Sequence, residues 1–169
     1  MSQWVTGFIS GVAATIVGFV FTMIWDLYKY RRDTNQREKS IIDITRHEIE
    51  ENRQASVENI SLLDGELEIL DKKKEIVRPL LLLKTGFWDL LKGNIPKQFL
   101  TNVKLIEKIQ SLSLLASHIN EQVRSRQNYK NSNSAMSDYN SSVKIQDKMI
   151  LADLKRFNNN ADDVLAEIQ

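Results

Sequence analysis

The chain has no cysteine, only two prolines and only six glycines among its 169 residues. Without cysteine it has no disulfide, no thiolate nucleophile and no zinc site with cysteine ligands, and this composition agrees with a reducing compartment. An excess of charge of one sign is missing as well, because 23 lysines and arginines balance 22 aspartates and glutamates. So small a net charge produces no overall field that favours nucleic acid, and we expect no nucleic-acid partner.

Signatures of catalysis and of cofactor binding are also missing. The sequence contains no phosphate loop ending in Lys-Ser or Lys-Thr, no G-x-G-x-x-G and no G-x-S-x-G elbow. His47 and Glu51 would share one face of a helix at the i, i+4 spacing of metal ligands, but a di-iron bundle needs Glu-x-x-His and position 44 is isoleucine. We therefore expect no enzyme, no cofactor and no metal, and interpret this stretch as a solvated acidic patch that pairs with Arg46 and Arg53.

One long apolar run stands at the start of the chain. Residues 4–25 carry no charge, and about 22 such residues form a helix that crosses a bilayer core roughly 30 Å thick. Residues 1–6 lack the basic segment of a secretory signal peptide. Basic residues follow the run and none precedes it, namely Lys29, Arg31, Arg32, Arg37 and Lys39. The positive-inside rule then predicts a single-pass protein of the cell membrane with its amino terminus outside and its C-terminal domain in the cytoplasm.

The predicted anchor has one face of small residues, which let helices approach closely in lipid. At about 100° per residue, Gly7, Gly11, Ala14 and Gly18 fall within a narrow arc. Two series at seven-residue spacing, typical of a left-handed coil, extend this face into a predicted oligomer interface within the membrane: Trp4, Gly7, Gly11, Ala14, Gly18, Phe21 and Trp25. In an oligomer Asp26 could form a ring of carboxylates at a pore mouth, although an interfacial Asp is more often only solvated.

The rest of the chain predicts an all-α fold, because no segment alternates apolar and polar residues with the period of a strand. We expect a transmembrane anchor over residues 1–29, a juxtamembrane helix over 30–57 and a cytoplasmic antiparallel bundle of about four helices over 58–169. The Asn/Ser-rich residues 127–142 predict a polar loop in the bundle. Apolar stripes at helical spacing predict three of its helices: Ile60, Leu63, Leu67 and Leu70; Leu105, Ile109, Leu112, Ala116, Ile119 and Val123; and Ile150, Leu154, Phe157, Ala161, Val164 and Ile168.

Residues 83–94, LKTGFWDLLKGN, follow the pattern L-x-T-x-x-W-x-x-L and then a glycine turn. This segment resembles prokaryotic single-span membrane proteins with a cytoplasmic helical domain of uncharacterised function, and the likeness extends over residues 40–125. The resemblance implies architecture and carries no activity. In physical terms we expect Thr85 to cap a short helix that ends at Gly93, and Trp88 to fill a gap between long helices.

These features favour a membrane-anchored, oligomeric scaffold or interaction protein without enzymatic activity. Its expected partners are the lipid bilayer and further copies of itself, with a cytoplasmic or membrane protein as a third candidate. Two alternatives stay open at this point. One is a small homo-oligomeric ion channel lined by the single span, and the other is an accessory subunit of a larger membrane complex. The number of subunits would separate these classes.

Overall fold

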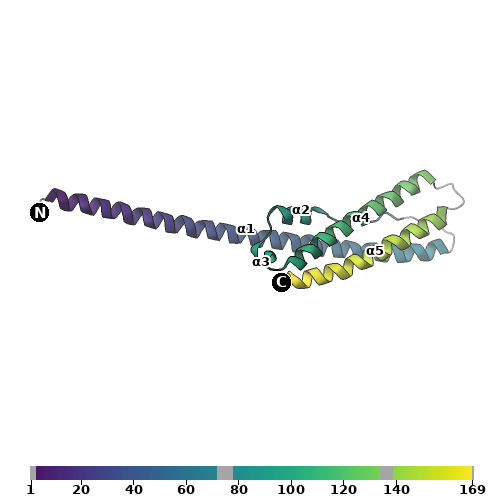
Figure 1. Cartoon of the computed structure of the whole chain (residues 1–169). Coiled ribbons are helices and arrows are strands. Elements are labelled where there is room, and N and C mark those ends of the chain that lie inside the picture. Colours follow the sequence, from purple (N-terminus) through teal and green to yellow (C-terminus); the bar gives the residue numbers. More distant parts are fainter. Residues whose placement is uncertain (1–2, 72–77, 134–138, 169) are drawn as a thin grey trace. The chain divides into compact units, whose positions relative to one another are not determined.

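The computed structural model describes residues 3–71, 78–133 and 139–168, and the side chains of residues 15–70, 78–129 and 139–168. Every regular element within these ranges is a helix, which confirms the all-α class (Figure 1). The elements are α1 (Gln3–Asp71), α2 (Gly86–Gly93), α3 (Lys97–Leu100), α4 (Val103–Asn133) and α5 (Tyr139–Glu167).

The chain divides into two compact units, Met1–Ser40 and Ile41–Gln169. The boundary falls inside α1 and not at residues 57 and 58, where the sequence had placed the start of the bundle. Residues 41–57 belong to the second unit because the side chains of Ile49, Asn52 and Ser56 are fully buried in it. More than half of the expected juxtamembrane helix, residues 41–57, is therefore part of the bundle.

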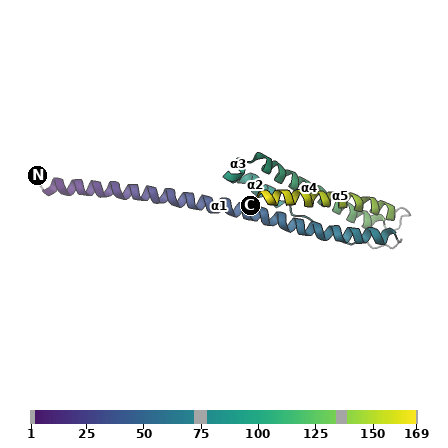
Figure 2. The same ribbon diagram turned by 90° about the horizontal axis from the view of Figure 1, so that it is seen from below.

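The second unit is built from three long helices that lie side by side: residues 41–71 of α1, α4 and α5 (Figures 1 and 2). This segment of α1 and α4 run in the same direction, and α5 runs opposite to both. The bundle thus has three long helices, with α2 and α3 as short additions, instead of about four. Steps of three and four residues place one stripe of α1 in the interior: Ile41, Thr45, Ile49, Asn52, Ser56, Asn59, Leu63, Glu66 and Leu70.

The two stripes expected in the C-terminal half are confirmed. All twelve of their side chains, from Leu105 to Val123 and from Ile150 to Ile168, are buried in the main core. The main core also contains Phe87, Leu91 and Phe99, which α2 and α3 supply. Because both stripes are buried in the same core, α4 packs against α5. This pairing is expected for two helices that each carry an apolar stripe of helical period.

The prediction of a polar loop over residues 127–142 is wrong wherever the structure describes these residues. Residues 127–133 complete α4 and residues 139–142 begin α5, while residues 134–138 lie outside the described residues. The helices continue because Tyr129 stacks on Tyr139, with ring centroids 6.0 Å apart. Tyr139 also packs with Leu70 and Val143 in a second, smaller core cluster. A stacked aromatic pair and a small apolar cluster thus lie at the helix ends that the sequence had assigned to a loop.

Local signals at the helix ends are present at α4 and partly absent at α2. Asn102 precedes α4, and its Oδ1 accepts a hydrogen bond from the Leu105 N–H at 3.1 Å, which is an N-cap. Thr85 occupies the expected N-cap position of α2, but its side chain makes no capping hydrogen bond, and α2 ends at Gly93 as expected. Trp88 is partly buried and packs against the main core, whereas its neighbour Phe87 is fully buried within that core.

Candidate functional site

The described part of the first unit carries an unusual amount of exposed apolar surface. Residues 16–25 include seven large apolar side chains and Trp25, each between 47% and 73% exposed. By helical rotation these side chains cover most of the circumference of α1, and the remaining arc holds Thr15, Gly18 and Thr22. The Thr22 hydroxyl donates to the carbonyl oxygen of Gly18 at 2.9 Å, so it is satisfied within its own helix.

The predicted oligomer interface falls partly on this segment. Phe21 and Trp25 are 73% and 66% exposed, and a Cβ atom on Gly18 would meet no atom within 4 Å. Trp4, Gly7, Gly11 and Ala14 lie in α1 but outside the residues whose side chains are described. Asp26 is exposed, and a ring of such carboxylates stays a prediction. Among the residues that the structure describes, no helix is long and apolar enough to cross a membrane.

In the bundle, an extended segment of residues 78–84 is held by asparagine side chains instead of by another strand (Figure 1). The Asn59 carboxamide on α1 accepts from the Leu81 N–H and donates to the Leu81 carbonyl oxygen, both at 2.8 Å. Asn120 on α4 pairs in the same way with Leu83, at 2.8 and 2.7 Å. Asn52 on α1 pairs with Lys84, at 2.6 and 2.7 Å. We call these three side chains the asparagine clamp.

The asparagine clamp explains how an irregular segment can lie against the core. A buried peptide group without a partner is unfavourable, and a carboxamide offers the donor and the acceptor that one residue of a neighbouring strand would supply. Leu80 and Leu83 are buried, whereas Leu81 and Leu82 are about half exposed. The clamp contacts main-chain atoms only, so it fixes the path of the segment without selecting its side chains.

Three charged side chains from the three long helices meet in the interior. Arg126 of α4, Glu66 of α1 and Asp147 of α5 are each exposed by 1% or less. Arg126 donates from Nη2 to Glu66 Oε1 at 2.5 Å and from Nε to Asp147 Oδ1. Its Nη1 donates to the carbonyl oxygen of Arg78 at 3.0 Å, and the Arg78 N–H donates to Glu66 Oε2 at 2.9 Å. We call Glu66, Arg126 and Asp147 the charge cluster.

The charge cluster is not neutral when both carboxylates are ionised, because two negative groups face one guanidinium. Asp147 Oδ2 is buried and has no hydrogen-bond partner among the described residues. Burial raises the pKa of Asp147 from 3.8 to about 6; Arg126 opposes this shift, and the nearby Glu66 adds to it. Chemically, the charge cluster can therefore take up one proton near neutral pH.

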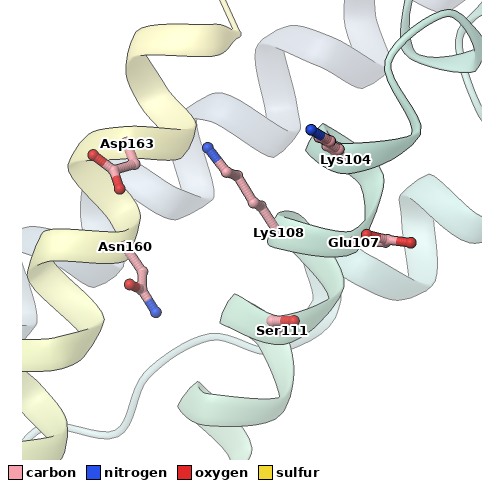
Figure 3. Close-up of a pocket in the computed structure, with 6 residues that line it drawn as sticks. All are labelled: Lys104, Glu107, Lys108, Ser111, Asn160 and Asp163. Carbon is pink, nitrogen blue, oxygen red and sulfur yellow. The ribbon is translucent and has the colours of Figure 1, made fainter.

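The surface of the bundle offers a groove of about 420 Å³ between α4 and α5, lined by Lys104, Glu107, Lys108, Ser111, Asn160 and Asp163. Lys108 extends from α4 toward α5, and Glu107 points away from α5 (Figure 3). Lys108 pairs with Glu167, and this contact raises the pKa of the lysine and lowers that of the carboxyl group. The lining carries both positive and negative side chains. Neither this lining nor any other described part of the chain brings together three side chains that could hold a metal ion.

The patch around His47 contains ion pairs. Arg46 donates to Glu50 at 3.1 Å, and His47 Nε2 lies 3.7 Å from Glu51. Glu51 has a closer partner in Lys84 at 2.7 Å, which lowers the pKa of Glu51 and raises that of Lys84. Arg53 reaches Asp162 on α5, outside the acidic patch that the sequence had assigned to it.

Neither the asparagine clamp nor the charge cluster was predicted from the sequence. The sequence does contain one sign that these positions on α1 are special, because Asn52, Asn59 and Glu66 follow one another at intervals of seven residues. Together with Leu63 and Leu70 they continue one helical stripe, which marks them as interior positions.

The chain was compared with protein-family models, with curated proteins and with solved structures, and none of the three comparisons gave a match. The resemblance of residues 83–94 to single-span proteins thus stays a prediction.

Proposed function

We propose that this chain is a single-pass membrane protein whose helical bundle serves as a cytoplasmic scaffold, without enzymatic activity. The observation that carries the proposal is the exposed apolar surface of residues 16–25. A helix with apolar side chains around most of its circumference is stable only when lipid or protein covers it. The uncharged run that contains these residues begins at position 4, which gives it the length of a membrane span.

The flanking residues support lipid as the covering. Trp25, Tyr28 and Tyr30 are 60–71% exposed, and their rings have the amphipathic character that favours the membrane interface. Basic residues follow between positions 29 and 39. This arrangement supports an orientation with the amino terminus outside and the bundle in the cytoplasm.

The proposed scaffold role rests on the polar side chains in the interior of the bundle. The two sets of interior polar side chains described above make structural contacts, because the asparagine clamp binds main chain and the charge cluster joins three helices. We further propose that copies associate through the Gly18 face of the anchor, where a Cβ atom added to Gly18 would meet no atom within 4 Å.

Two experiments test the membrane anchor. The full chain should stay in the membrane fraction after alkaline carbonate extraction, and replacement of Val17 and Val20 by lysine should release it. A cysteine in place of Ser2 should react with an impermeant maleimide on intact cells, whereas one in place of the exposed Ala152 should react only after lysis. Complete extraction of the unaltered chain would refute the anchor, and the reverse labelling pattern would refute the orientation.

The Gly18 position tests self-association sharply. A leucine there should reduce crosslinked oligomers in membranes, and the loss must come from another helix, since a Cβ at this position meets nothing of its own chain within 4 Å. Ile16→Leu is the matched control, because Ile16 is 58% exposed and lies on the apolar arc. Equal oligomer yields for Gly18→Leu and the unaltered chain would rule out this face as the interface.

A further inference from the structure

The charge cluster lies between the main core and a separate, smaller group of buried apolar side chains. The main core extends along α4 as far as Val123 and begins on α5 at Ile150, whereas Leu70, Tyr139 and Val143 form a separate small cluster beyond it. Glu66, Arg126 and Asp147 lie in sequence between the two sets. We call residues 60–70, 120–129 and 139–150 the distal half of the bundle. Within this half the main core contributes Leu63, Val123 and Ile150, and the small cluster contributes Leu70, Tyr139 and Val143.

Among the described residues, the charged groups next to Asp147 are Arg126 of α4, which donates to it, and Glu66 of α1. The main chain of Arg78 contacts Arg126 and Glu66, and the Arg78 side chain is exposed. Three of the four carboxylate oxygens accept hydrogen bonds, and Asp147 Oδ2 does not. No described group donates to Asp147 Oδ2, and the cluster has a net charge of −1 when both carboxyl groups are ionised, so one bound proton would make it neutral.

We propose that Asp147 is a proton-binding site that controls how tightly the distal half of the bundle closes. A proton on Oδ2 makes the charge cluster neutral and leaves the hydrogen bond from Arg126 to Oδ1 intact. Loss of that proton leaves an uncompensated negative charge buried between α1, α4 and α5, which favours states in which the distal half opens to water. The proximal half keeps its larger core in both states.

The titration of Asp147 supports this inference and gives its direction. In the folded chain the pKa is about 6, above its ordinary value of 3.8, because the carboxyl group is buried. The folded state therefore holds the proton more tightly than the unfolded state does. The stabilisation is present in full below about pH 4 and is lost as the pH rises through 6, so the distal half should be tighter at pH 5.0 than at pH 7.5.

Hydrogen exchange of the full chain in detergent micelles, corrected for the intrinsic effect of pH, tests the proposal. Amides of residues 60–70 and 139–150 should be about tenfold or more better protected at pH 5.0 than at pH 7.5, as expected when one buried group binds a proton more tightly in the closed state. Amides of residues 105–118 should change much less. In Asp147→Asn the difference should vanish, and in the control Asp162→Asn, an exposed position on the same helix, it should persist.

Two further measurements keep the proposal falsifiable if Asp147→Asn fails to fold. In Glu66→Gln the protection of the distal half should change at a lower pH, because the neighbouring negative charge is gone. In the unaltered chain the carbon-13 resonance of the Asp147 carboxyl group should titrate near pH 6. Equal protection of the distal half at both pH values, a pH dependence that survives in Asp147→Asn, or titration of Asp147 near pH 4 would each overturn the proposal. None of these results depends on whether the first unit spans a membrane.

Discussion

Asn59 and Leu81 form a closed ring of two hydrogen bonds, one in each direction, although 22 residues separate them in the chain. The side chain of Asn59 takes the part that a neighbouring strand would play. Asn120 and Asn52 repeat this arrangement, so the extended segment keeps its main-chain hydrogen bonds without a β-sheet.

The asparagine clamp should contribute measurably to stability. Asn59→Ala leaves both polar groups of Leu81 without partners, and we expect the free energy of unfolding to fall by about 2–3 kcal/mol. Chemical denaturation of the full chain in detergent, followed by circular dichroism at 222 nm, would measure this change. Asn159→Ala is the control, because Asn159 is exposed on α5. A similarly small effect of both substitutions would show that the clamp is not stabilising.

Arg126 should be more important for stability than a surface arginine. Arg126→Met removes the only cation of the charge cluster and leaves two buried carboxylates facing each other, which should destabilise the bundle by about 3–5 kcal/mol at pH 7.5. Adding Glu66→Gln and Asp147→Asn to Arg126→Met should restore part of this loss, because no buried charge then remains. If the triple variant melts no higher than Arg126→Met alone, unpaired charge is not the cause.

Thr45 and Ser56 should respond with opposite signs when their hydroxyl groups are removed. Both side chains are fully buried. The Thr45 hydroxyl has no partner among the described residues, so Thr45→Val should raise the free energy of unfolding by about 1 kcal/mol. Ser56 donates to the carbonyl oxygen of Leu154 at 3.2 Å, and Ser56→Ala should lower it by about 1 kcal/mol. Denaturation midpoints that shift in the same direction would contradict the hydrogen-bond assignment.

Burial on α5 can be tested with one change at two positions. Leu154→Asp places a carboxylate in the main core and should destabilise the bundle by several kcal/mol, enough to unfold a small domain. Ile145→Asp introduces the same group at a position that is 62% exposed, and the melting temperature should stay within a few degrees. If the Leu154→Asp variant keeps the helical circular dichroism and the melting temperature of the unaltered chain, the core packing is disproved.

The sequence predicted the parts of the fold in which apolar residues recur at helical spacing. Every member of the α4 and α5 stripes is aliphatic or aromatic, and such a stripe can be stable only when buried. The α1 stripe was missed over much of its length because Thr45, Asn52, Ser56, Asn59 and Glu66 have polar side chains, and polarity by itself indicates solvent. Their burial depends on partners such as Leu81 and Arg126, which are distant in sequence and become neighbours only in the folded bundle.

The predicted loop failed for a related reason. A run of Asn and Ser indicates a turn when only local preferences act. Tyr129 and Tyr139 supply a tertiary contact that outweighs those preferences, and a single-sequence reading has no means to pair two rings across ten residues. The candidate oligomer interface, in contrast, was deduced from the arc of small residues and from two series at seven-residue spacing. Of its members, Gly18, Phe21 and Trp25 lie among the residues whose side chains the structure describes.

The asparagine clamp also determines the topology that the chain can adopt. Two helices joined by a short turn must run in opposite directions, but the bundle segment of α1 and α4 run in the same direction (Figure 2). The chain therefore has to return along the bundle before α4 begins. An extended segment advances about 3.3 Å per residue and a helix about 1.5 Å, so the strand-like path needs fewer than half as many residues for the return. By supporting that path, three carboxamides allow a parallel helix pair without a further long helix between its members.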